Sequence, residues 1–304
     1  MSNVVRAVRT SGTGGMSTWA RAARRRAGQL PLHAVIITIS LLWMTPTVGL
    51  LVSSFRPRDA VRSTGWWTVF VNPFDFTQYT LENYAAVLTA QGMGRAFLNS
   101  LIIAVPSTLI PIALAALAAY AFAWMEFPGR QTLFAIVVGL LVVPLQMTLI
   151  PILRLYNQLG LSGTFLGIWL AHTGYGLPFA VYLLRNFFGA LPRELFESAF
   201  LDGASWFTAF TRLALPLSVP ALASLAIFQF LWVWNDLLVA LIYLGGTEQV
   251  APLTVRLSTL VNSLGQNWEL LTAAAFVSMA LPLALFFSLQ RYFVRGILAG
   301  SVKG

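Results

Sequence analysis

The 304-residue sequence contains no cysteine and only two histidines, and charged residues make up only 10% of it. The absence of cysteine excludes disulfides, thiolate metal sites and thiol catalysis. The two histidines, His33 and His172, fall in different apolar runs, so a histidine metal site is not expected. The sequence has no glycine-rich phosphate loop ending in Lys-Ser/Thr and no His-Glu-x-x-His pair. We therefore predict a chain without catalytic residues, metal or cofactor, which is not an enzyme.

Apolar residues, in contrast, form 58% of the sequence and give a mean hydropathy of +0.75. This balance is typical of a membrane protein, because so few charged residues could hardly cover a water-soluble domain of this length. The net charge of +9 would favour a nucleic-acid partner if basic and aromatic residues alternated on one face, but the basic residues gather at the ends of apolar runs. We predict contact with membrane lipid and none with nucleic acid.

Six apolar runs are each long enough to cross a bilayer, which takes about 20 helical residues. They predict an all-α, polytopic membrane protein with six transmembrane helices, at about residues 31–54, 97–123, 131–153, 165–184, 217–244 and 270–289. Broken helices are tolerated in lipid only where protein or a watery cavity satisfies the freed backbone groups. The prolines within the runs therefore favour a pathway over an inert anchor; they are Pro106, Pro111, Pro144, Pro151, Pro178, Pro220 and Pro282.

The basic residues also predict the orientation of the chain in the membrane. Cytoplasmic N- and C-termini place 13 of the 19 basic residues inside and 6 outside, as the positive-inside rule favours. Residues 1–29 carry arginines and no acid and predict a disordered cytoplasmic tail, with a mitochondrial transit peptide as the alternative. Residues 30–304 would then form the membrane domain, with an external segment at 55–96 and a cytoplasmic loop at 185–216.

Within that cytoplasmic loop, residues 191–216 combine helix signals with charged side chains. Pro192 suits a first helical turn, and the acids Glu194 and Glu197 follow where the helix dipole favours them. An apolar stripe is expected from Leu195, Phe196, Ala199 and Phe200, followed by a turn with positive φ at Asp202 and Gly203 and a second short helix at about 205–213. Since anionic lipid would repel this acidic polar face, a docking element is favoured over a helix lying on the membrane surface.

The loop also carries a spaced motif: Glu197-Ser198-Ala199, three residues, Gly203, nine residues, then Leu213-Ala214-Leu215-Pro216. It resembles the EAA loop of permease subunits in bacterial ABC importers, which reads Glu-Ala-Ala, three residues, Gly, nine residues, Ile-x-Leu-Pro. Ser198 and Leu213 are the two departures. Asp202-Gly203-Ala204-Ser205, Trp234-Asn235-Asp236 and residues 290–296 and 300–304 are similar to the maltose-type carbohydrate branch of that family. The resemblance covers about residues 30–304.

This resemblance implies the type I permease fold of ABC importers, in the bacterial cytoplasmic membrane. The implied partners are a second, homologous permease subunit, two ATP-binding subunits that hydrolyse ATP, and an extracytoplasmic solute-binding protein. It implies contact with an ATP-binding subunit through Glu194, Leu195, Glu197, Ala199, Phe200, Asp202, Gly203 and Ala204, with Gly203 as a hinge. It also implies that a tail inserts between the two ATP-binding subunits, through Gly300, Ser301, Val302, Lys303 and Gly304.

Three further tracts, 246–249, 253–256 and 266–273, are similar to α-glucoside permeases within that branch. They imply import of an α-linked glucoside, such as a maltose- or trehalose-like sugar, by alternating access. A permease for another solute, such as glycerol phosphate, is one alternative. A facilitator that works without nucleotide is the other.

Polar residues within the apolar runs are the candidates for a solute path, because sugars bind between amide or carboxylate groups and aromatic rings. The set is Gln146, His172, Tyr175, Gln229, Trp232, Asn235 and Asp236. Asp236 is the only ionisable residue of its run, and a pathway role and structural hydrogen bonding both remain open for it. In the external segment, Trp66, Trp67, Phe74 and Phe76 indicate either anchoring at the membrane interface or contact with a solute-binding protein.

Overall fold

A computed structural model describes the backbone of residues 18–260 and 267–301, with side chains at 29–260 and 267–288. Every regular element in these ranges is a helix, which confirms the all-α prediction. By their internal contacts, the residues fall into two compact units, Met1–Val52 and Ser53–Gly304.

The first unit consists of helix α1 (Thr18–Ser54), apart from its last two residues. Alanine and arginine, both strong helix formers, dominate its first turns, so residues 18–29 of the predicted tail are helical. Residues 1–17 of that tail lie outside the described part of the chain. From Gln29 to Ser54 the helix is apolar, and large side chains such as Ile37 and Leu42 are exposed. This exposure is what a helix facing lipid requires.

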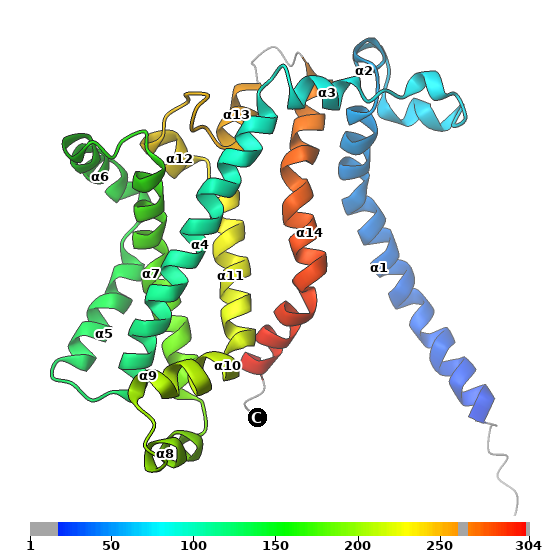
Figure 1. Cartoon of the computed structure of the whole chain (residues 1–304). Helices are drawn as coiled ribbons and strands as arrows, with labels where there is room; N and C mark the ends of the chain where they lie inside the picture. Colours follow the sequence, from blue (N-terminus) through cyan, green and yellow to red (C-terminus); the bar gives the residue numbers. More distant parts are fainter. Residues whose placement is uncertain (1–17, 261–266, 302–304) are drawn as a thin grey trace, which may run out of the picture. The chain divides into compact units, whose positions relative to one another are not determined.

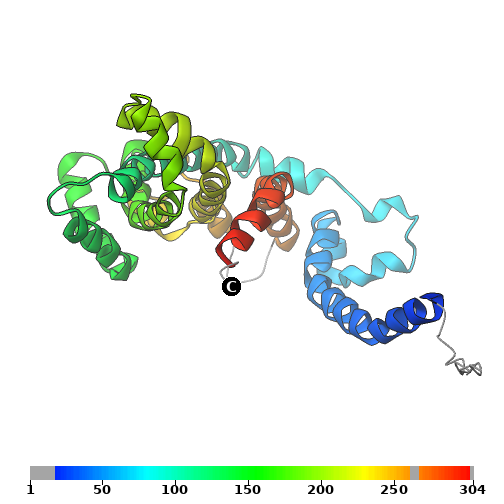
Figure 2. The same cartoon turned by 90° about the horizontal axis from the view of Figure 1, so that it is seen from below.

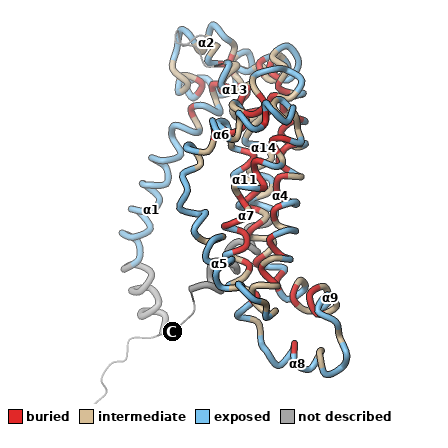
Figure 3. The backbone as a smooth tube through the Cα atoms, turned by 90° about the vertical axis from the view of Figure 1, so that its left-hand side faces the viewer, coloured by how far each residue is buried: buried red, intermediate tan, exposed pale blue. Residues whose placement is uncertain are grey.

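The second unit is built around four long helices: α4 (Met93–Trp124), α7 (Phe165–Gly189), α11 (Val219–Trp234) and α14 (Trp268–Ser301). Figure 1 shows them side by side, and Figure 2, seen from below, places α14 next to α11. Buried residues gather along α4, α7 and α11 (Figure 3). Small side chains on α4, among them Ala115, Ala116 and Ala119, allow the close approach to α7 that helices use in lipid.

Two of the predicted crossings are not single continuous helices. Run 131–153 is divided into α5 (Arg130–Gly139), η3 (Leu140–Val142) and α6 (Leu145–Leu159), and the parts bend by 101°. The break falls at Val143-Pro144, because a residue before proline avoids the helical conformation. Run 217–244 is divided into α11 and α12 (Leu238–Tyr243), with residues 235–237 between them.

By length and composition alone, the predicted count of six crossings is not reached within the described residues. Three helices are long and apolar enough, namely Gln29–Ser54, Met93–Trp124 and Trp268–Ser288. Two bent pairs raise the number to five; they are Arg130–Val142 with Leu145–Leu159, and Trp206–Leu217 with Val219–Trp234. Helix α7 has 25 residues and is long enough, but it also contains polar side chains such as His172.

Short elements cover the two ends of the four-helix core (Figure 1). One end carries α2 (Arg58–Ser63), η1 (Trp66–Phe70), η2 (Phe76–Gln78), α3 (Glu82–Leu88), α12 and α13 (Leu253–Leu260). The opposite end carries α8 (Arg193–Leu201), α9 (Trp206–Ala209), the π-helical η4 (Phe210–Ala214) and α10 (Leu215–Leu217). The predicted external segment and the predicted cytoplasmic loop therefore lie at opposite ends of the core.

Candidate functional site

The hairpin formed by residues 191–217, called here the coupling hairpin, has the local structure that its sequence predicts. Helix α8 starts after Pro192 and has Glu194 in its first turn. At its end, the amide of Gly203 donates to the carbonyl of Phe200 at 3.1 Å, and that of Ala204 to Ala199 at 2.9 Å. Gly203 has a φ of +83°, the left-handed conformation that glycine adopts without steric cost. The predicted turn is confirmed, but its positive φ is confined to Gly203, since Asp202 has a φ of −77°.

The second half of the coupling hairpin begins at Ser205, as predicted. Its side-chain oxygen accepts a hydrogen bond from the amide of Thr208 at 3.1 Å and so caps α9. The chain then continues through η4 and α10 into α11, with Pro216 inside α10. This arrangement connects α8 to α11 through three consecutive helical segments, α9, η4 and α10.

One aromatic contact fixes α8 to the core. Phe196 is completely buried, and its ring stacks on that of Trp124 with 3.9 Å between centroids. The indole N–H of Trp124 in turn donates to the carbonyl of Phe188 at 3.1 Å, so the contact joins the ends of α4, α7 and α8. The sequence predicts Phe196 only as a member of the apolar stripe, not as the anchor. Its partner Trp124 went unnoticed, because the two are distant in the sequence.

The opposite side of the hairpin remains uncovered. Leu195 is 45% exposed and Leu201 88% exposed, and the acids Glu194, Glu197 and Asp202 are exposed around them. Ala199, Phe200 and Ala204 are partly buried, and the ring of Phe200 packs against Trp206 at 4.5 Å between centroids. The hairpin thus exposes an acidic and apolar surface while its inner side is packed.

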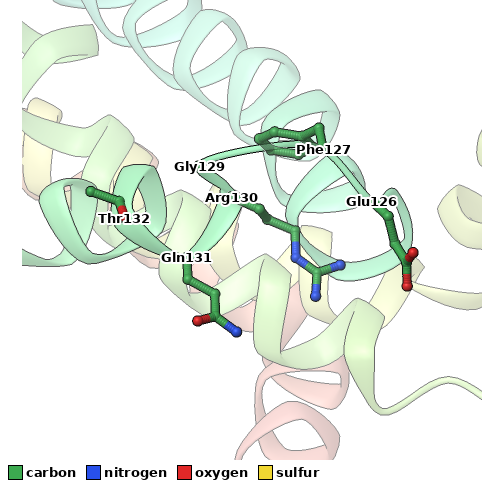
Figure 4. Close-up of a pocket in the computed structure, with 6 residues that line it drawn as sticks. All are labelled: Glu126, Phe127, Gly129, Arg130, Gln131 and Thr132. Atoms are coloured by element: carbon green, nitrogen blue, oxygen red, sulfur yellow. The ribbon is translucent and has the colours of Figure 1, made fainter.

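A polar hollow of about 380 Å³ lies in the loop that joins α4 to α5 (Figure 4). The guanidinium of Arg130 donates to the carbonyl of Met125 at 2.9 Å and holds this loop in shape. The residues that line the hollow are Glu126, Phe127, Gly129, Arg130, Gln131 and Thr132, none of which the sequence analysis singled out.

The predicted tail contact falls almost wholly outside what the structure describes. Gly300 and Ser301 form the end of α14, and only their backbone is described. Val302, Lys303 and Gly304 lie outside the described residues. The role assigned to these five residues stays a prediction.

Among the candidates for the solute path, Tyr175, Gln229 and Trp232 lie together between α7 and α11. All three line a cavity of about 330 Å³, and Tyr175 and Trp232 also line a second cavity of about 460 Å³ that reaches α6. The amide of Gln229 donates to the carbonyl of Ser107 at 3.2 Å, which ties α11 to α4. Aromatic rings next to an amide are a suitable surface for a sugar.

The hydroxyl of Tyr175 belongs to a chain of hydroxyl groups that the sequence analysis missed. It bonds the hydroxyl of Thr148 at 2.9 Å and that of Tyr243 at 2.8 Å, and so links α6, α7 and α12. A signal was present in the sequence, since a tyrosine within an apolar run needs a partner for its hydroxyl. The identity of the partners depends on the fold.

His172 and Asp236 face each other at 3.8 Å between Nε2 and Oδ2, which is too long for a hydrogen bond. His172 is fully buried, its ring lies edge-on to Trp232 at 5.4 Å, and neither ring nitrogen has a hydrogen-bond partner among the described residues. The carboxylate of Asp236 accepts hydrogen bonds from the amides of Val239 at 3.2 Å and Ala240 at 2.8 Å. Asp236 therefore caps α12, which is the structural alternative that the sequence left open.

Two other candidates lie apart from this group. Gln146 is exposed on α6 and lines neither cavity. Asn235 is exposed too, and its amide donates to the carbonyl of Leu231 at 2.7 Å, at the end of α11. The structure thus brings together five of the seven predicted residues.

Comparison with known proteins extends this picture. The family described as binding-protein-dependent transport system inner membrane component matches residues 16–299. An osmoprotective compounds uptake permease protein of Synechocystis is 67% identical, over 90% of this chain and 92% of the relative. An alpha-glucoside transport system permease protein of Rhizobium meliloti is 45% identical, over 93% of this chain and 99% of the relative.

A solved structure has the same fold. It is a bacterial alginate ABC transporter in complex with an alginate pentasaccharide-bound periplasmic protein, and one of its chains superposes with a TM-score of 0.59 at 18% identity. The match covers 91% of this chain and 99% of that one. At this identity the likeness shows the fold alone, and it agrees with the permease fold predicted above.

Proposed function

Because the chain belongs to the family of inner-membrane components of binding-protein-dependent transport systems, we propose that it is the permease subunit of an ATP-driven sugar importer. The subunit itself is a non-catalytic membrane component. Two separate ATP-binding subunits would hydrolyse ATP on the cytoplasmic side. Both termini and the coupling hairpin would then face the cytoplasm, as the distribution of basic residues favours.

The observation that carries this proposal is the coupling hairpin itself. Its inner side is fixed to α4 and α7 through Phe196, while its outer side exposes Leu195 and Leu201 among three acids. A surface of this kind can bind a partner and transmit the partner's movement to the long helices. Glu197 would contribute an ionic contact to an ATP-binding subunit, and Gly203 the hinge between α8 and α9.

The family and the fold support the remaining partners that we propose. A second, homologous permease subunit would close the two cavities between α6, α7 and α11. The five C-terminal residues from Gly300 would insert between the two ATP-binding subunits. A periplasmic protein bound to its solute accompanies the alginate transporter described above. We propose that an extracytoplasmic solute-binding protein likewise delivers the solute to this permease.

For the solute, we propose an α-linked glucoside that also protects against osmotic stress, such as a trehalose-like sugar. The two curated relatives named above take up osmoprotective compounds and alpha-glucosides, respectively. The path would run beside Tyr175, Gln229 and Trp232, whose rings and amide suit a sugar. Transport would occur by alternating access, with energy entering through contacts that differ between the outward-facing and inward-facing states.

The experiment is uptake into proteoliposomes that contain the assembled complex, with ATP inside and the solute-binding protein outside. We expect trehalose or maltose to stimulate both uptake and ATP hydrolysis, and glycerol phosphate to stimulate neither. Stimulation by glycerol phosphate alone would overturn the sugar assignment. Uptake that continues without ATP, in a preparation from which no ATP-binding subunit co-purifies, would support the nucleotide-independent facilitator instead.

A further inference from the structure

Residues 64–81, called here the aromatic lobe, expose more apolar surface than the rest of the external segment. Side chains with 62% to 85% exposure point out of it: Trp67, Phe70, Val71, Phe74, Phe76 and Leu81. Contiguous apolar surface of this kind is rare where a protein faces water and marks contact with a partner or a membrane. Neither the coupling hairpin nor the proposed solute path uses these residues.

The lobe is held in shape from inside, so this exposure is built into the fold. Arg56 is buried, and its guanidinium donates to the carbonyl of Gly65 at 3.0 Å and to the hydroxyls of Thr64 at 2.6 Å and Thr68 at 3.2 Å. The amide of Thr80 donates to the carbonyl of Phe55 at 2.6 Å and closes the segment at its other end. The lobe is therefore clamped at both ends.

Charge is almost absent from this surface. Between Ser63 and Gly94 the sequence contains no basic residue and only two acids, Asp75 and Glu82. The carboxylate of Asp75 accepts hydrogen bonds from the amide of Thr77 at 3.1 Å and from its hydroxyl at 2.6 Å, so it caps η2. A docking surface for a soluble protein has a polar rim with about one hydrogen bond per 100–200 Å². The aromatic lobe has no basic side chain to offer to such a rim, and the carboxylate of its one acid before Glu82, Asp75, is already bonded within the lobe.

The position of the lobe along the membrane normal follows from its contacts with α14. This helix is long and apolar enough to cross a membrane from Trp268 to Ser288. Arg58 lies 3.6 Å from the carboxylate of Glu269, in the first turn of α14, and α3 packs against the same helix. The start of α2 is therefore level with the outer end of a membrane span. In Figure 1 the chain between α2 and α3 extends to the side of α14 instead of continuing along its axis.

We propose that the aromatic lobe lies in the outer interface of the lipid bilayer, with its exposed rings among headgroups and the ends of acyl chains. Tryptophan and tyrosine, here Trp67 and Tyr79, concentrate at this depth because their rings join an apolar body to a polar group, while the exposed phenylalanine rings would reach the ends of the acyl chains. The salt bridge of Arg58 and the packing of α3 transmit this anchoring to the outer end of α14. Of the two alternatives that the sequence left open, the structure favours lipid over the solute-binding protein.

The absence of cysteine makes a direct test possible, since each introduced cysteine carries a unique spin label. We would label V71C, F74C and F76C, one at a time, in the full chain within its assembled complex in lipid nanodiscs. These side chains are largely exposed, so their replacement leaves the packing intact. The matched control is A90C, also exposed and external but outside the lobe. The relaxation of each label is measured with oxygen, which concentrates in lipid, and with a water-soluble nickel complex.

We expect the ratio of oxygen to nickel collisions at 71, 74 and 76 to exceed the ratio at 90 several-fold. A ratio equal to that at 90 places the lobe in water and overturns the proposal. Shielding from both reagents means that a protein covers the lobe and also overturns it. The proposal is also overturned if the nickel complex reaches the labels until the solute-binding protein is added, because that protein is then the partner. The readout requires no transport, so it is independent of the proposed function.

Discussion

At the scale of single residues, the backbone of Gly203 explains why the coupling hairpin needs a glycine between α8 and α9. No atom lies within 4 Å of a Cβ added there, so the positive φ alone disfavours a side chain. We predict that Gly203→Ala costs about 1–2 kcal/mol of hairpin stability. Sugar uptake by the complex should fall, while the amount of chain inserted in the membrane stays constant.

The matched control for this change is Gly189→Ala. A Cβ added at Gly189 also meets no atom within 4 Å, and its φ is not positive. Uptake should therefore be close to normal in this variant. If both variants transport equally well, the left-handed turn at Gly203 has no part in coupling.

Asp236 shows how a buried acid can have a structural function. Its carboxylate accepts two amide hydrogen bonds at the start of α12. We predict that Asp236→Ala destabilises the protein by about 1 kcal/mol, as the loss of a helix cap does. Asp236→Asn keeps one acceptor oxygen and should cost less. Thermal unfolding in detergent measures both, and equal unfolding temperatures for wild type and Asp236→Ala would contradict the capping role.

A conformation that depends only on residues close in the sequence can be predicted from the sequence. The positive φ of Gly203 and the cap at Ser205 were both predictable, because turn and cap involve residues no more than five positions apart. The stacking of Phe196 on Trp124 and the chain from Thr148 through Tyr175 to Tyr243 were not. These contacts exist only once separate helices have packed together.

At the scale of secondary-structure elements, the two sides of α8 should respond differently to mutation. Phe196 anchors the helix, so Phe196→Ala should cost about 3–5 kcal/mol, as for a large buried aromatic. Leu195 is its neighbour on the exposed side, and Leu195→Ala should leave the unfolding temperature unchanged but weaken binding of the ATP-binding subunit. Thermal unfolding and co-purification separate the two effects. The hairpin assignment would be wrong if Leu195→Ala unfolded the protein and Phe196→Ala did not.

Packing between α7 and α11 depends on Gly176. A Cβ at this position would lie 2.6 Å from the side-chain nitrogen of Gln229 and would displace that amide from the carbonyl of Ser107. We predict that Gly176→Ala destabilises by about 1–3 kcal/mol, the usual cost of leaving a buried polar group unpaired. Gly174→Ala is the control, because no atom lies within 4 Å of its added Cβ. Thermal unfolding of the two variants should differ accordingly; identical values would exclude this packing role.

The lengths of the apolar runs predicted the positions of the helices better than the positions of the breaks within them. Pro106 and Pro111 lie inside α4, which remains one helix, whereas Val143-Pro144 ends a helical segment and begins a bend of 101°. In the fifth run there is no proline at the break, and Asp236 caps the new helix instead. The outcome at each proline depends on whether neighbouring helices satisfy the freed backbone groups, and a single sequence does not contain that information.

At the scale of the whole molecule, composition was enough to predict an all-α membrane protein, and the spaced motif around Gly203 pointed to the family that the comparison identified. The placement of the external segment and the coupling hairpin at opposite ends of the core agrees with the predicted topology. The end that faces the cytoplasm is inferred from the distribution of basic residues, so the orientation stays a prediction.

The central claim is that the coupling hairpin faces the cytoplasm and is held there by an ATP-binding subunit. Because the chain has no cysteine, Leu195→Cys gives a single thiol on the exposed side of α8. A membrane-impermeant maleimide should label it in inside-out vesicles of the permease alone and not in right-side-out vesicles, and assembly with the ATP-binding subunit should block the labelling. Labelling from the outer side, or equal labelling with and without that subunit, would contradict the account.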